Sequence, residues 1–471
     1  MSVPSTHRYV LRAVIEFTTP FLVGAGRGGD VADAVFVADA NGLPALPGSS
    51  LAGALRAAFH GAGHSPEDEN RLFGYQDGDT GAGSRLSVSW ACIHDQHDRP
   101  VEGIVEPRRL DDPVLAMARV PTIRDHVRIS HRGAADSSGH GKFDEQAVGA
   151  GQRFTFEMEL DGVAADERLW DALLGVVGDP ALRLGGRTRR GFGGFRIVSA
   201  GARVFDLAKD FGDYSRHPVS LASPSPVLSP LKTTAGGVPS SWATIRVDLR
   251  PQGYWMFGGG QDLAGVLGDA DMAPVRDCRV VWNKGHGRVV EDLVVLPGTG
   301  IKGALAHRVA FHYNALSGTF ADGLGADGVE AVTGPRNGAV GALFGFCKGD
   351  AGEDGEDGRR GRVVIDDLFL EASPPSQLVH HVGIDRFTGG ARDQVLFCER
   401  PFWQGGAVAI AIHVEDPSSL DGRVREALRL AIVDLVEGRL QMGAGAGRGL
   451  GYFRGTAEWP EAFQGTAEGP Q

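Results

Sequence analysis

Two glycine-rich segments contain the residues best suited to binding an anion. They read LGGRTRRGFGGFR (184–196) and MGAGAGRGLGYFRG (442–455), and their candidate phosphate-binding side chains are Arg187, Arg189, Arg190 and Arg448. Glycine permits backbone conformations that leave N–H groups uncovered, and arginine pairs with phosphate through two hydrogen bonds where the geometry allows. A solvated turn is the alternative interpretation of each segment, but the presence of a second such segment favours phosphate binding.

Two Pro-Gly turns, each followed by an expected helix, offer a second kind of anion site. LPGSSLAGALR (46–56) and LPGTGIKGALAHR (296–308) place Ser49, Ser50 and Thr299 in the first helical turn. A helix N-terminus presents unpaired N–H groups and the positive end of the helix dipole, so it favours phosphate. The basic side chains that follow along these helices are Arg56, Lys302 and Arg308. Simple N-capping by Ser49 or Thr299 is the alternative, and the absence of GxxxxGK[ST] argues against nucleotide hydrolysis.

The chain also repeats itself. Five segments return in the same order: LPGSSLAGALR as LPGTGIKGALAHR, RLFGYQDGD as ALFGFCKGD, DHVRI as HHVGI, KFDE as LFCE and GFGGFR as GLGYFR. A collinear series of this kind indicates a tandem duplication, with a period too long for a solenoid. We therefore divide the chain into a first domain (1–205), a semi-extended Pro/Ser-rich linker (206–240), a second domain (241–457) and a C-terminal tail (458–471).

Each repeat contains the elements of a ferredoxin-like domain. In the first repeat, the pattern predicts strands at RYVLRAVIEFTTPFLVG, RLSVSWACI, RFTFEMELDG and GGFRIVSA, with helices at SSLAGALRAAFHGAG and ERLWDALLGVVGD. In the second, the strands are TIRVDLRP, VVIDDLFLE, VAIAIHVED and YFRGTAEW, with helices at GIKGALAHRVAFHYNAL and VREALRLAIVDLVEG. The order strand, helix, strand, strand, helix, strand predicts an α+β protein of two ferredoxin-like domains with long insertions.

The composition of the chain argues against several classes of protein, among them collagens, membrane proteins and secreted proteins. The 471 residues include 70 glycines without a collagen period and carry a net charge of −12, which does not exclude local basic grooves for nucleic acid. No apolar stretch approaches the length of a membrane helix, and no signal-peptide core is present. The four cysteines are far apart and form no CxxC pair, so we expect neither disulfides nor zinc and place the protein in the cytoplasm.

The two LPG helices, the HVRI and FDE segments and the closing Gly-rich loop together resemble the RAMP superfamily. The set is most similar to the backbone subunits of type III CRISPR effector complexes, the Csm and Cmr backbone proteins. Because it is present twice, the chain resembles two fused backbone subunits, as in type III-D-like systems. The likeness spans nearly the whole chain outside the linker and the tail.

The resemblance implies an RRM-like palm in each half and a thumb hairpin that intrudes between guide and target RNA. The thumbs would be HVRISHRGAADSSGHGKFDE (126–145) and HVGIDRFTGGARDQVLFCE (381–399). Their candidate residues are Val127, Arg128, Phe143, Val382, Arg386 and Phe397. The histidines beside the thumbs, His126, His380 and His381, are assigned no role.

The resemblance also implies a target-RNA cutter, an aspartate in the loop that precedes the LPG helix. Asp33 matches best, in DAVFVAD (33–39), although Val35 stands where the family usually has proline, and Asp30 is its rival. In the second repeat, Asp271 precedes Ala-Pro-Val, and Asp269 is the rival. A carboxylate and a divalent cation, for which we expect Mg²⁺, can promote attack of a 2′-hydroxyl on the adjacent phosphate.

The sequence thus favours a guide-RNA-binding backbone subunit that cuts complementary target RNA within a type III CRISPR effector complex. Its expected partners are guide CRISPR RNA, target RNA and other effector subunits, among them a polymerase-like large subunit. The alternatives are a non-catalytic RNA-binding filament subunit and a guide-RNA-processing endonuclease.

Overall fold

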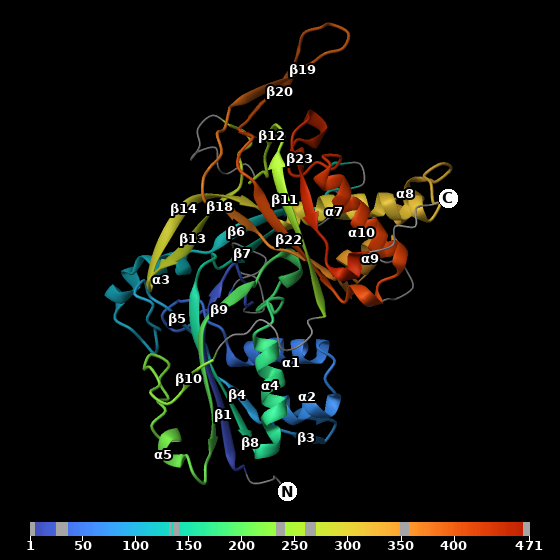
Figure 1. The fold of residues 1–471 in the computed structure, drawn as a ribbon. Coiled ribbons are helices and arrows are strands. Elements are labelled where there is room, and N and C mark those ends of the chain that lie inside the picture. Colours follow the sequence, from blue (N-terminus) through green and yellow to red (C-terminus); the bar gives the residue numbers. More distant parts are fainter. Residues whose placement is uncertain are drawn as a thin grey trace.

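We describe the protein from a computed structural model, which describes residues 5–24, 36–130, 133–135, 141–231, 241–259, 270–348 and 358–464. The chain forms two domains of the same architecture, each an antiparallel sheet with helices on one face (Figure 1). The predicted α+β class with two ferredoxin-like domains is therefore confirmed.

The first domain is built on one antiparallel sheet. Its strands lie in the order β10 (Ser229–Pro230), β9 (Phe195–Asp206), β1 (His7–Phe17), β8 (Arg153–Gly162) and β4 (Leu86–Val88), and β5 (Cys92–Ile93) also pairs with β8. The alternation in β1 turns Tyr9, Leu11 and Ile15 into the core. There they pack against the covering helices α1 (Gly48–Gly61), α2 (Pro66–Phe73) and α4 (Glu167–Val177) (Figure 1).

The second domain repeats this order. Its sheet runs β17 (Val363–Ile365), β22 (Val408–Glu415), β11 (Trp242–Pro251), β23 (Phe453–Glu458). The accompanying helices are α7 (Gly298–Leu316), α8 (Ala326–Thr333), α9 (Gly338–Phe344) and α10 (Gly422–Val436). β1, β8, β4 and β9 thus correspond to β11, β22, β17 and β23, as a tandem duplication requires.

Three hairpins extend from these sheets. The two expected thumbs are β6 (Thr122–Val127) with β7 (Lys142–Ala147), and β19 (Val379–Ile384) with β20 (Ala391–Glu399). β19 and β20 project away from the body of the protein (Figure 1). A third hairpin pairs β13 (Arg276–Asn283) with β14 (His286–Leu296), and β14 also pairs with β18 (Leu368–Leu370). Smaller elements are α3 (Pro113–Arg119), α5 (Phe211–Tyr214) and the strand pairs β2 (Tyr75–Asp77) with β3 (Thr80–Ala82), β12 (Tyr254–Trp255) with β21 (Phe402–Trp403) and β15 (Gly345–Phe346) with β16 (Arg359–Arg360).

Some local expectations were wrong. The strand expected over RYVLRAVIEFTTPFLVG ends at Phe17, shortly before Pro20, which has no N–H to continue the pairing. The segments RLSVSWACI and VVIDDLFLE each contain two strands, because a turn interrupts them; in the second, the carboxylate of Asp367 turns to accept a hydrogen bond from Gly298 N–H at 2.9 Å. Neither Ser49 nor Thr299 caps its helix. The N-cap residues are Pro47 and Pro297, and neither has a side chain that can cap its helix.

The structure places part of the expected linker on the first sheet. Arg12 donates hydrogen bonds to the carbonyls of Pro218 (2.7 Å) and Ser223 (2.7 Å), and β10 joins the sheet edge. Residues 206–231 therefore lie against the first domain, while 232–240 fall outside the described residues. No helix within the described parts of the chain is both long and apolar enough to cross a membrane.

Candidate RNA-binding site

The two Gly-rich loops have the same backbone conformation. Each wraps a single helical turn, Thr188–Arg190 or Ala446–Arg448. Left-handed residues occur at matching positions, which are Gly185, Arg187, Gly191 and Gly193 in the first loop and Gly443, Gly445, Gly449 and Gly451 in the second. A Cβ added at Gly193 or Gly451 would lie 2.1 Å from a carbonyl oxygen, so only glycine fits there. The two repeats therefore contain the same loop structure.

Each loop meets a buried carboxylate at the base of a thumb. In each repeat, four residues form what we call the thumb-base cluster. They are Glu145, His126, Phe143 and Arg190 in the first repeat, and Glu399, His381, Phe397 and Arg448 in the second. Arg190 pairs with Glu145 at 2.5 Å, and Arg448 pairs with Glu399 at 2.6 Å. The imidazole of His126 lies 3.4 Å from Glu145, and that of His381 lies 2.8 Å from Glu399.

The aromatic ring of each cluster is matched as well. His126 stacks on Phe143 with 4.9 Å between ring centroids, and His381 stacks on Phe397 with 4.8 Å, both at an interplanar angle of 21°. The guanidinium of Arg190 lies 4.5 Å from the Phe143 ring, and that of Arg448 lies 5.3 Å from the Phe397 ring. The cluster joins each thumb to its Gly-rich loop in the same way.

The clusters change the electrostatics of the loops. Burial alone would raise the pKa of Glu145, but His126, Arg190 and Arg187 together hold that pKa below its usual value. Glu145 is therefore ionised and partly neutralises the loop arginines. Sequence reasoning missed both glutamates, and its only signal for them was the recurrence of KFDE as LFCE. Arg187 also pairs with Glu145, at 2.5 Å, yet its side chain stays 46% exposed.

Arg189 and Lys302, both expected to bind RNA, instead join the two domains. Arg189 pairs with Glu415 at 2.7 Å and lies 4.9 Å from the ring of Trp242. The ammonium of Lys302 donates hydrogen bonds to the carbonyls of Arg189 (2.7 Å) and Val363 (2.9 Å). The first Gly-rich loop is thus seated on the second domain.

Buried ion pairs complete this joint between the domains. Arg124 of β6 pairs with Asp277 at 2.7 Å and with Asp367 at 3.4 Å, and these side chains are 7%, 5% and 3% exposed. Arg183 pairs with Asp366 at 3.0 Å. In each of these ion pairs the arginine comes from the first domain and the acid comes from the second.

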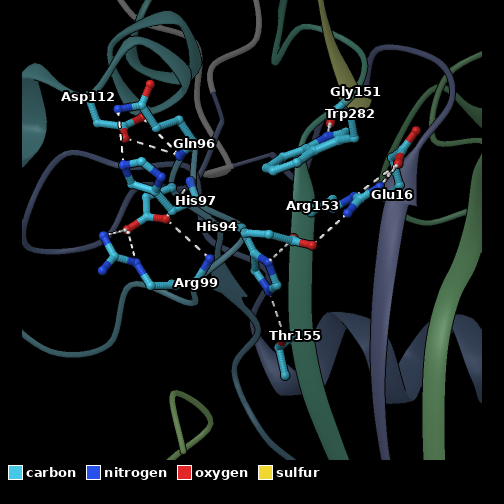
Figure 2. Close-up of polar contacts among 12 residues, drawn as sticks. Glu16, His94, Gln96, His97, Arg99, Asp112, Gly151, Arg153, Thr155 and Trp282 are labelled. Carbon is cyan, nitrogen blue, oxygen red and sulfur yellow. Dashed lines mark hydrogen bonds and ion pairs between the residues drawn. The ribbon is translucent and has the colours of Figure 1, made fainter. Parts of the chain in front are cut away.

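The β13–β14 hairpin extends the joint along the first sheet (Figure 2). Trp282 donates a hydrogen bond to the Gly151 carbonyl (2.7 Å), and its ring lies 4.3 Å from the guanidinium of Arg153. Arg153 in turn pairs with Glu16 at 2.9 Å. His94 is buried in the same network and shares a hydrogen bond with Thr155 (2.7 Å), so Trp282 of the second domain packs against a network within the first.

Lys302 gives the joint a pH dependence. Burial, together with Arg189 and Arg190, lowers the pKa of Lys302 to about 7. Between about pH 7 and pH 10 the unfolded chain therefore binds a proton at this lysine that the folded chain does not, so the free energy of unfolding rises with pH, by up to roughly 4 kcal/mol.

Urea unfolding from pH 6.5 to 9.5 should show this rise in the parent chain but not in Lys302→Met. The control is Lys209→Met, since Asp206 raises the pKa of that exposed lysine. Parallel curves for the parent and Lys302→Met would contradict the prediction.

Of the other side chains predicted to contact RNA, some are exposed and others interact with residues of this chain. Ser49 and Ser50 are exposed at the start of α1, Thr299 is half-buried, and Arg386 is exposed in the second thumb. Val127 and Val382 are each 49% exposed. Arg56 pairs with Glu69 at 2.6 Å and Arg308 with Asp434 at 2.5 Å, and Arg128 has an interaction partner as well.

Of the aspartates expected to cut RNA, only Asp271 lies within the described residues; Asp30, Asp33 and Asp269 lie outside them. Asp271 is exposed beside the second thumb, where its Oδ2 accepts a hydrogen bond from Cys398 N–H at 2.7 Å. Over the described ranges, no group of three or more His, Cys, Asp or Glu side chains is arranged to hold a metal ion. A lone carboxylate is nevertheless compatible with Mg²⁺, which keeps waters and substrate phosphates as ligands.

Comparison with known proteins agrees with this architecture. No curated protein matches the chain. The family model described as RAMP superfamily matches residues 14–196 and 228–454, one region in each domain. The chain therefore belongs to the RAMP superfamily and is a CRISPR-associated RNA-binding subunit.

Proposed function

We propose that this chain is a double backbone subunit of a type III CRISPR effector complex, which binds guide RNA along both repeats and cuts complementary target RNA. The observation that carries the proposal is the internal duplication of loop and thumb-base cluster, with the Gly-rich loop of the first domain in contact with the second domain. Contacts between unlike faces place successive copies along a line, which suits an extended nucleic acid.

Guide RNA is held through its backbone in this proposal. The exposed serines at the start of α1, the Gly-rich loops and the exposed edge of Arg187 suit phosphates and 2′-hydroxyls. Such binding depends little on base identity and weakens steeply with salt, since each neutralised phosphate releases counterions.

RNA binding by the purified chain tests this. We expect Arg187→Ala with Arg448→Ala to lower affinity for guide RNA and to reduce the slope of log affinity against log salt by about 1 to 2. Arg108→Ala is the matched control, because Arg108 is 82% exposed and its ion-pair partner is an exposed glutamate. Arg189 is unsuitable as a test residue because its loss would loosen the joint. If the double variant has the same affinity and the same salt slope as the parent, the loops do not contact the RNA.

Target cleavage in this proposal uses Asp33 in the first repeat and Asp271 in the second. Each carboxylate would help to take the proton from a 2′-hydroxyl, whose oxygen attacks the adjacent phosphorus while the 5′-oxygen leaves. A divalent cation held by the carboxylate and the phosphate would neutralise the charge that develops. The thumbs would set where along the target the reacting phosphate lies.

One observation favours a scaffold role for the second repeat. Asp271 already accepts a hydrogen bond from Cys398 N–H, which anchors one carboxylate oxygen to the base of the thumb. A repeat whose aspartate serves the thumb in this way would bind guide RNA without cutting the target. The guide-processing alternative has no such support, because His126 and His381 are turned to buried glutamates.

A further inference from the structure

Two exposed histidines, one from each domain, lie close together where the β13–β14 hairpin meets the first domain. His97 belongs to the first domain and His286 to the hairpin, and their ring centroids are 5.4 Å apart at an interplanar angle of 52°. The proposed function uses neither of them. Because imidazole is the commonest metal ligand among side chains, two imidazoles brought together from distant parts of a chain are a candidate site for a shared ion.

The separation of the two rings suits one shared metal ion. Zn²⁺ lies about 2.0–2.1 Å from the nitrogen of an imidazole ligand, which puts the centroid of that ring about 3.2 Å from the metal. Two such ligands at a tetrahedral angle have their centroids about 5.2 Å apart. The 5.4 Å between His97 and His286 is close to this spacing. Since both rings are exposed, each can turn about its side-chain torsions to direct a nitrogen at the ion.

Backbone hydrogen bonds hold the two turns that carry the histidines. The N–H of Gly287 donates to the carbonyl of Gln96 at 2.8 Å, which joins the neighbours of the two histidines across the domains. In the second domain, the hairpin reverses at Lys284–Gly285, where both residues have positive φ. In the first domain, the N–H of His97 donates to the carboxylate of Asp95 at 3.0 Å. The two ligands are thus preorganised, which reduces the cost of binding an ion.

The chemistry of the ligands selects the class of ion. Imidazole nitrogen suits Zn²⁺, Ni²⁺ and Cu²⁺, whereas Mg²⁺ prefers oxygen. With two protein ligands, the ion completes its shell with water, in keeping with the finding that the described ranges hold no metal-binding group of three or more such side chains. The carboxylate of Asp112, which accepts a hydrogen bond from Gln96 N–H at 3.1 Å, adds negative charge next to His97 (Figure 2).

We propose that His97 and His286 together bind a divalent transition-metal ion of the class that favours imidazole, and that this ion ties the two domains together. The site is separate from the aspartates of the proposed function and uses imidazoles, not the cysteines whose spacing argues against zinc. A shared ion stabilises only the state in which both histidines meet, which is the folded chain with its joint formed. Binding should therefore raise the stability of the chain.

Thermal unfolding with and without Ni²⁺ tests the proposal on the full chain, prepared without a polyhistidine tag. We expect about 1 mM Ni²⁺ to raise the unfolding midpoint of the parent by at least 2 °C, in order of magnitude, and Mg²⁺ not to distinguish the parent from the variants. Both His97→Ala and His286→Ala should abolish the Ni²⁺ effect and lower the affinity for Ni²⁺ about 10-fold or more. The matched control is His60→Ala, because His60 is 70% exposed and pairs with the carboxylate of Glu69.

Two separate substitutions make the result specific to a shared ion. If only one of them abolishes the rise, a single histidine binds Ni²⁺ and the proposal is wrong. An equal rise in the parent and both variants, or no rise in the parent, would also overturn it, since the two rings would then only pack together. Stoichiometric Cu²⁺ should give an EPR spectrum with coupling to two imidazole nitrogens in the parent and to fewer in either variant. Because both histidines are exposed, the variants without metal should unfold like the parent.

Discussion

We expect Asp33→Ala to remove one product from the cleavage of target RNA, with a fall in the rate of that cut of about 100-fold or more, as for loss of a proton-transfer group. Guide binding and the other cut should persist, because each repeat cuts with its own aspartate in the proposed function. The measurement is the product ladder of an end-labelled target complementary to the guide, with and without EDTA, which should stop all cleavage.

Two further variants make this result specific. Asp30→Ala is the control in the same loop and should leave the ladder unchanged. If the second repeat cuts, Asp271→Ala should remove a second product, whose cut lies at a fixed spacing from the first. If the parent chain makes one cut and Asp271→Ala leaves that cut intact, the second repeat is a scaffold. If the Asp33→Ala ladder equals that of the parent, the assignment passes to Asp30.

The second large effect concerns the joint. Arg124→Ala should lower the free energy of unfolding by about 3–5 kcal/mol, because it leaves Asp277 and Asp367 buried without their cation. Burial already raises the pKa of Asp367, so the variant should shift that carboxyl further toward its neutral form. Urea unfolding at neutral pH measures the loss, and a separate transition for each domain would show that the joint couples them.

The chain provides a matched control for this substitution. Val379→Ala changes the same strand position in the second thumb, where no carboxylate from another domain is paired, and should cost about 1 kcal/mol or less. Adding Asp277→Asn and Asp367→Asn to Arg124→Ala should recover part of the loss, since the unpaired charges are then removed. A loss below about 1 kcal/mol for Arg124→Ala alone would mean that the ion pairs contribute little to the joint.

Much of the fold was readable from local patterns. Alternation in RYVLRAVIEF and RFTFEMELDG depends only on which neighbours point to the same face, so it predicts β1 and β8 without knowledge of what covers them. The recurrence of LPG and Gly-rich segments likewise predicted two copies of one domain. The expected strand RLSVSWACI failed because a turn at Ser89–Trp90 depends on the close approach of Val88 to the helix start at Gly48.

The repeated fold, the Gly-rich loops and the positions of the thumbs could be predicted from the sequence, because strand alternation, helical spacing and glycine chemistry act over a few neighbouring residues. The partners of the charged side chains could not, because they depend on the tertiary structure. Arg189 and Lys302 read as phosphate ligands along the chain, yet they meet Glu415 and the Arg189 carbonyl across the joint. For Glu145 and Glu399 the sequence offered only the recurrence of KFDE as LFCE, and their ion pairs form because the thumb folds against the loop and buries them beside arginines. An arginine pairs with whichever carboxylate the fold brings within a few ångströms, and that distance depends on residues far apart in the chain.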